Sequence, residues 1–139
     1  MPRLLAIDYG SKRCGIAVTD PLQIIANGLT TVKSFELLQY LNEYFEREQV
    51  EKVVIGYPTN LDGTNTHATP LVLNFIKSFK KKFPTVPIVP VDEQYTSKLA
   101  TRAMLDMGLK KKDRRKKELV DEISATIILQ GYLNQSKET

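Results

Sequence analysis

The sequence contains little that could support disulfide, thiol or histidine chemistry. Among its 139 residues it has one cysteine, one histidine and no tryptophan. A single cysteine excludes an internal disulfide and is typical of a reducing compartment, so we expect a cytoplasmic protein. Cys14 falls in a strand-like stretch and is predicted to be a small core residue. The one histidine, His67, receives no role, and nothing indicates a serine–histidine–aspartate triad.

The sequence also lacks any apolar run that approaches the roughly 20 residues of a membrane-spanning helix. Met1-Pro2-Arg3 leads directly into a strand-like pattern, which predicts no signal or transit peptide. The hydrophobic content of 42% and charged content of 26% are typical of a globular protein that buries its own core. Because no repeat or linker interrupts the pattern, we expect one domain over residues 1–139.

Positive charge gathers in two blocks of a chain whose formal net charge is +4. Such blocks commonly bind phosphate backbones, although a solvated helix face or a loop produces the same pattern. The blocks are Lys77, Lys80, Lys81 and Lys82, followed by Lys110, Lys111, Lys112, Arg114, Arg115, Lys116 and Lys117. Their composition favours nucleic acid as a partner.

Hydrophobic periodicity predicts the secondary structure. The expected strands are residues 3–8, 14–19, 24–33, 52–56 and 88–91. The expected helices are residues 34–48, with Ser34 as N-cap, 67–83, 96–107 and 118–133, followed by a frayed end at 134–139. Pro90 predicts an edge position for the last strand. An antiparallel meander followed by alternating helices and strands predicts an α/β fold. It is a five-stranded mixed sheet flanked by helices, in the order of the RNase H-like fold.

Carboxylates close two strands of this predicted sheet. Asp8 ends the first strand, and Asp92 and Glu93 end the last, so parallel neighbours would bring them to one edge. Asp121 lies in the first turn of the last helix, on the same helical stripe as Ala125, which is predicted to pack on the sheet. A charge that leads a buried stripe needs a partner.

Three carboxylates at one place repel one another unless a cation neutralises them, and such oxygen ligands suit Mg²⁺ or Mn²⁺. Two ions about 4 Å apart can activate a water and stabilise the leaving oxygen of a phosphodiester. Each acid also has a structural explanation, Asp8 as a turn residue and Asp121 as a favourable charge on the helix dipole. The residues alone do not distinguish Asp92 from Glu93, so the hypothesis depends on three acids sharing one edge.

Two polar loops are predicted at the same edge. The turn at residues 9–13 offers Lys12 and Arg13 to a phosphate, and a plain hairpin explains it equally well. The loop at residues 57–66 offers Asn60 to a ribose or phosphate, although a structural turn accounts for most of that stretch.

Four motifs occur in order along nearly the whole chain. They are Asp8-Tyr9-Gly10-Ser11-Lys12-Arg13-Cys14-Gly15-Ile16-Ala17-Val18, Gly56-x-Pro58-x-Asn60-x-Asp62-Gly63, Asp92-Glu93 followed by Thr96-Ser97, and Val120-Asp121 ahead of Ala125 and Ile127-Ile128-Leu129. This set resembles the YqgF family, also called RuvX-type Holliday junction resolvases or pre-16S rRNA nucleases. The resemblance implies an RNase H-like fold, a bacterial cytoplasmic location and a metal-dependent nuclease for the 5′ end of 16S rRNA.

The resemblance also implies site residues. It assigns Asp8, Glu93 and Asp121 as the acidic triad and so selects Glu93 over Asp92. Gln94 stands where the family usually has an arginine, so a charged hydrogen bond is lost there. Ser124 stands where the wider RNase H-like group often has a fourth acid, and we therefore expect a second metal ion to be held weakly.

The leading hypothesis is a Mg²⁺- or Mn²⁺-dependent endonuclease that processes precursor 16S rRNA, in contact with pre-ribosomal particles and not with a membrane. One alternative is a resolvase of branched DNA, which needs two active sites and hence a dimer. Others are a non-catalytic ribosome-assembly factor and a lobe of an actin-like ATPase, for which 139 residues are too few. We expect a monomer or weak homodimer. Predicted nucleic-acid contacts are Lys12, Arg13, Asn60, Lys110, Lys111, Lys112, Arg114 and Arg115.

Overall fold

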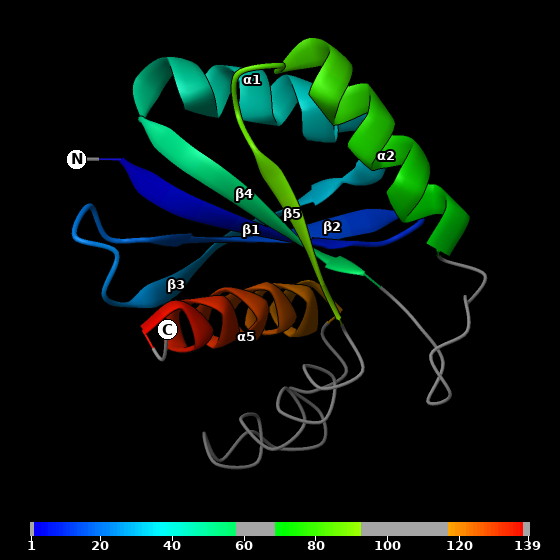
Figure 1. Ribbon diagram of the computed structural model, residues 1–139. Coiled ribbons are helices and arrows are strands. Elements are labelled where there is room, and N and C mark those ends of the chain that lie inside the picture. Colours follow the sequence, from blue (N-terminus) through cyan, green and yellow to red (C-terminus); the bar gives the residue numbers. More distant parts are fainter. Residues whose placement is uncertain (1, 58–68, 93–116, 138–139) are drawn as a thin grey trace.

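A computed structural model describes residues 2–57, 69–92 and 117–137. Its centre is a five-stranded sheet in the order β3-β2-β1-β4-β5 (Figure 1). The strands are β1 (Arg3–Tyr9), β2 (Arg13–Thr19), β3 (Ala26–Lys33), β4 (Val50–Tyr57) and β5 (Ile88–Asp92). The helical elements are the 3₁₀ turn η1 (Ser34–Glu36), α1 (Leu37–Arg47), α2 (Thr69–Lys82) and α5 (Lys117–Lys137).

The strand directions confirm the predicted mixed sheet. β1, β2 and β3 form an antiparallel meander, whereas β1, β4 and β5 are parallel to one another. Pro90 lies in β5, which is an edge strand as its proline predicts. The C-terminal ends of β1, β4 and β5 therefore lie along one edge of the sheet, where the sequence predicts its acidic residues.

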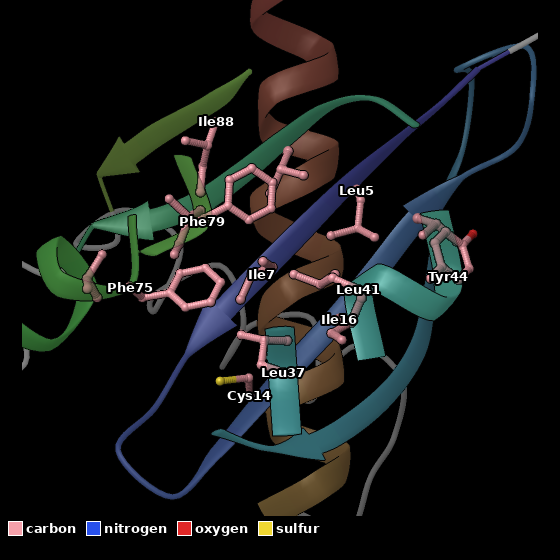
Figure 2. Close-up of a cluster of buried hydrophobic side chains, with 14 residues drawn as sticks. Leu5, Ile7, Cys14, Ile16, Leu37, Leu41, Tyr44, Phe75, Phe79 and Ile88 are labelled. Carbon is pink, nitrogen blue, oxygen red and sulfur yellow. The ribbon is translucent and has the colours of Figure 1, made fainter. Parts of the chain in front are cut away.

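Helices cover the two faces of the sheet, α1 and α2 on one side and α5 on the other (Figure 1). Leu5 and Ile7 of β1 belong to the core under α1 and α2, which Figure 2 shows, and Cys14 is buried there as predicted. Leu4 and Ala6 belong to the second core, under α5. Alternate residues of β1 thus enter different layers, as the period of two in a strand requires.

Helix α5 runs back along the sheet, opposite to the direction of β1. Lys52 Nζ, near the start of β4, donates a hydrogen bond to the Tyr132 hydroxyl at 2.7 Å. The amide of Ala26, beside the end of β2, donates to Gln130 Oε1 at 3.3 Å. These bonds hold the C-terminal half of α5 at the N-terminal ends of β1 and β4. Its first turns therefore lie toward the edge where those strands end (Figure 1).

Two predicted helix ends are wrong. Ser34 is not an N-cap, because its hydroxyl donates to the Gly10 carbonyl at 2.6 Å, and α1 begins only at Leu37 after a 3₁₀ turn. The last helix does not fray at residue 134 but continues to Lys137. Leu133 remains in the core, and Gln130 Nε2 donates to Asn134 Oδ1 at 3.2 Å across the next turn.

The third strand begins at Ala26, two residues later than predicted. The Asp20 carboxylate accepts hydrogen bonds from the amides of Ile24 and Ile25, at 2.8 and 2.9 Å, and so turns the chain before the strand starts. These hydrogen bonds hold the pKa of Asp20 below its ordinary value, and the bond from the Ile25 amide has the largest effect. The helix predicted at residues 96–107 lies outside the described residues. Within them, no helix is long and apolar enough to cross a membrane.

Candidate functional site

Asp8 lies near the C-terminal end of β1, directly opposite Gly15 of β2. Gly15 is in turn paired with Thr31 of β3, so these three residues form one row across the sheet. Directly paired residues share a face, and Asp8 has the phase of Leu4 and Ala6, which pack under α5. The Asp8 side chain therefore lies on the α5 face, and the glycine beside it leaves no side chain between Asp8 and Thr31.

The Asp8 carboxylate is half-buried, and within the described part of the chain it has no hydrogen-bond or ion-pair partner. Asp20, at the opposite edge, accepts two backbone hydrogen bonds and so has an evident structural purpose. The turn explanation for Asp8 requires a bond of that kind. No such bond is found for Asp8 among the described residues, so the turn explanation is without support there and Asp8 stays a candidate cation ligand.

The other two acids of the predicted triad are only partly covered by the structure. Glu93 lies outside the described residues, directly after Asp92, which closes β5 in register with Tyr57. Asp121 lies near the start of α5, one helical turn before Ala125. Among the described side chains no three acids, histidines or cysteines form a metal-binding group. The end of β1, the end of β5 and the first turns of α5 do share one edge of the sheet (Figure 1).

A pocket of about 700 Å³ opens beside the row of Asp8. It lies between the β1–β2 turn and the end of β3, and its lining residues are Ser11, Lys12, Arg13, Thr31, Val32, Lys33, Ser34 and Phe35. Two of the predicted nucleic-acid contacts, Lys12 and Arg13, therefore line one concave surface. Sequence reasoning missed Lys33 and Phe35, although an aromatic residue beside a lysine in a polar link could have indicated them.

The β1–β2 turn is fixed against η1 by hydrogen bonds. The Ser34 amide donates to the Lys12 carbonyl at 3.0 Å, and its hydroxyl donates to the Gly10 carbonyl. A Cβ at Gly10 would collide with the carbonyl oxygen of Arg13. The tight turn itself thus requires this glycine, which favours the hairpin explanation of Gly10.

Two glycine substitutions should shift stability in opposite directions. Gly10→Ala should lower the free energy of unfolding by about 1–3 kcal/mol, because the new Cβ meets a backbone oxygen. Gly131→Ala should raise it by roughly 0.5–1 kcal/mol, because Gly131 lies within α5 and a Cβ there meets nothing within 4 Å. Urea unfolding measures both changes, and an unaltered midpoint for Gly10→Ala would show that the turn is not tight.

The other polar and basic residues singled out in the sequence have different outcomes. Asn60, His67 and the basic stretch at residues 110–116 lie outside the described residues. Lys77 and the lysines at 80–82 are exposed on α2, on the face of the sheet that Asp8 does not share. Their position favours the solvated helix face over a role beside Asp8.

Comparison with solved structures shows the class of fold. The chain is similar to Thermus thermophilus RuvC in complex with a Holliday junction substrate, with a TM-score of 0.58, 16% sequence identity and coverage of 97% of this chain and 96% of RuvC. It is also similar to the fowlpox virus resolvase in complex with Holliday junction DNA, with a TM-score of 0.58, 12% identity and coverage of 96% and 98%. The protein thus has a RuvC-like, RNase H-like fold, as predicted.

Sequence comparison shows the family. A family model described as "RuvX: Holliday junction resolvase" matches residues 2–135. A protein of Phocaeicola vulgatus is 54% identical over 99% of both chains, and one of Christiangramia forsetii is 55% identical over 96% of this chain and 98% of its own. Both are named "Putative pre-16S rRNA nuclease". The chain belongs to the RuvX family, also called YqgF, which confirms the resemblance found in its four motifs.

Proposed function

We propose that this protein is a divalent-metal-dependent endonuclease that hydrolyses phosphodiester bonds of precursor 16S rRNA in the bacterial cytoplasm. The observation that carries the proposal is Asp8, a half-buried carboxylate that has no partner among the described residues, at the edge shared by β5 and α5. The names of relatives more than 50% identical over nearly the full length support the RNA substrate and a role at pre-ribosomal particles.

The strand phase of β5 supports Glu93 as the second acid. Val91 packs against the core under α5, which is the face that carries Asp8. Positions two apart in a strand share a face, and Glu93 stands two positions after Val91 in the sequence, which supports Glu93 as the acid on that face. Asp92 has the opposite phase. This argument agrees with the family motif and is independent of it.

The helical stripe of α5 supports Asp121 as the third acid. Ala125 and Ile128 are buried against the sheet, and Asp121 precedes them on the same stripe by one and two turns. Since the first turns of α5 lie toward the edge where β1 ends, the stripe leads from the core to the neighbourhood of Asp8.

Carboxylate oxygens are the ligands that Mg²⁺ and Mn²⁺ prefer, so Asp8, Glu93 and Asp121 are the residues that would hold the ion. A bound divalent cation lowers the pKa of water and offsets the charge that develops on the phosphate. The chain itself would supply the carboxylates and the cationic groups for flanking phosphates. We propose Lys12 and Arg13, which line the pocket, for that second task, together with Asn60 and the stretch from Lys110 to Arg115.

Branched DNA is the second candidate substrate. The family description and the two structurally similar resolvases, both described with Holliday junctions, favour it. Symmetric cutting of a four-way junction requires two active sites and therefore a dimer. A protein that stays monomeric at working concentration would count against this candidate.

Incubating the purified protein with precursor 16S rRNA and with a four-way DNA junction, each with and without Mn²⁺, tests the proposal. We expect cleavage of the RNA near its 5′ end only when Mn²⁺ is present. Symmetric cutting of the junction alone would select the resolvase. Failure to cut either substrate, by protein that binds Mn²⁺, would contradict the nuclease and favour a non-catalytic assembly factor. The Asp8→Asn protein, purified in parallel, reports any contaminating ribonuclease.

A further inference from the structure

Phe35 is a large apolar side chain with no place in the core. Its side chain is 83% exposed, and it lies in η1, the short link between β3 and α1. Lys33 Nζ lies 5.9 Å from the centre of its ring, within the range of a cation–π contact. The ring thus presents an exposed aromatic surface beside a positive charge.

The pocket beside Phe35 is suited to an anion. Lys12, Arg13 and Lys33 line it, and none of its eight lining residues, all in the described part of the chain, carries a carboxylate. Ser11 and Thr31 add hydroxyl groups to the wall, and Val32 and Phe35 add apolar surface. A cationic groove next to an exposed aromatic ring is the combination by which proteins bind single-stranded nucleic acid.

The register of the sheet relates this pocket to Asp8. Arg13 pairs with Lys33, and Gly15 pairs with Thr31, so Arg13, Thr31 and Lys33 of the pocket wall lie on the same face as the Asp8 side chain. Val32, which also lines the pocket, has the opposite phase. Neighbouring strands are about 4.8 Å apart, which places Thr31 roughly 10 Å from Asp8 across β2. At about 3.4 Å per stacked nucleotide, the separation between Asp8 and Thr31 of the pocket wall corresponds to roughly three nucleotides.

We propose that Phe35 stacks on the base of an unpaired nucleotide a few positions from the cleaved bond, while Lys12, Arg13 and Lys33 bind the adjoining phosphates. This inference rests on the proposed nuclease function and adds a substrate class to it, namely nucleic acid with a single-stranded flank. Any base offers a face to the ring, so the contact selects unpaired over paired nucleotides and not one sequence over another.

Binding measured in the Asp8→Asn protein tests the contact without interference from cleavage. The probes are a short single-stranded RNA and a blunt RNA duplex of the same sequence. We expect Phe35→Ala to weaken binding of the single strand by about tenfold or more and to leave binding of the duplex within about twofold. Leu22→Ala, which truncates another exposed apolar residue in the β2–β3 link, is the matched control and should change neither.

Phe35→Trp supplies a direct signal, because the chain has no other tryptophan. The tryptophan fluorescence should be quenched by the single-stranded RNA and little affected by the duplex. The Phe35→Trp protein should bind the single-stranded RNA with the same affinity as the protein that retains Phe35. Lys33→Ala should reduce the slope of log affinity against log salt by about 0.7, the contribution of one phosphate of a single strand.

Equal affinity of Phe35 and Phe35→Ala for the single strand, or no binding of it by either protein, would overturn the inference. If Phe35→Ala weakens binding of the single strand and of the duplex equally, the inference is overturned too, because stacking on an unpaired base cannot produce that result. Failure of the nuclease function is seen separately, as absence of Mn²⁺-dependent cleavage by protein that retains Asp8.

Discussion

Asp8→Asn is expected to reduce metal-dependent cleavage by at least about a hundredfold, while the protein stays folded. The amide has the shape of the carboxylate but lacks its charge, and it is a poor ligand for Mg²⁺ or Mn²⁺ in a site that needs charge compensation. Loss of groups that merely orient metal ligands already costs about 10–100-fold, so loss of a ligand should cost no less. Rates of RNA cleavage at saturating Mn²⁺ measure the effect.

The stability of Asp8→Asn separates this role from a structural one. Because Asp8 has no partner among the described residues, the substitution should leave the free energy of unfolding unchanged or slightly raised. Asp20→Asn is the matched control, since it removes one carboxylate at the opposite edge, where two amides donate to it. That control should cleave normally. Full activity in Asp8→Asn, or equal loss in both variants, would contradict the assignment.

Phe79→Ala is expected to lower the free energy of unfolding by about 3–5 kcal/mol. The Phe79 ring is fully buried between α2 and the sheet (Figure 2). Its centre lies 5.0 Å from that of Phe83, 6.1 Å from Phe75 and 6.3 Å from Phe45. Truncation removes contacts with three rings at once and leaves a cavity that a packed sheet cannot close. Urea unfolding, compared with the unsubstituted chain, measures the loss.

The activity of Phe79→Ala provides a second readout. Phe79 lies in the core under α1 and α2, on the face opposite to Asp8. Folded Phe79→Ala protein, held well below its melting temperature, should therefore keep its dependence on Mn²⁺. Leu73→Ala, an exposed position of the same helix, should change stability by less than about 0.5 kcal/mol. A loss below about 1 kcal/mol for Phe79→Ala would show that this core is loosely packed.

Much of the sheet could be predicted because its strands have clear local patterns. The apolar runs around Ile7 and Ile55 belong to strands buried on both faces, and Pro90 marks an edge. Ser34 was mispredicted because its hydroxyl has a better acceptor, Gly10, which lies 24 residues away in sequence. The helix continues beyond residue 133 although residues 134–139 have no apolar periodicity, because Leu133 anchors the preceding turn in the core and Gln130 donates to Asn134 across the next one.

The parts of the candidate site that could be predicted are those that the local sequence pattern places. Asp8 follows an apolar run, and a carboxylate in that position indicates the end of a buried strand. The pocket was not predictable, because Lys33 joins Arg13 only through the pairing of β2 with β3. The family motif predicts Glu93 over Asp92 from the sequence, but the physical argument for that choice depends on Val91 facing α5, since sequence alone does not fix which face of β5 is which.

Titration of Mn²⁺ into the unsubstituted protein, Asp8→Asn and Asp20→Asn, followed by calorimetry in the absence of nucleic acid, tests the central claim most directly. The claim is that the Asp8 carboxylate holds a divalent cation. We expect the unsubstituted protein and Asp20→Asn to bind Mn²⁺ alike, and Asp8→Asn to bind it at least about tenfold more weakly. Equal affinity in all three proteins would contradict the claim, whatever the cleavage rates show.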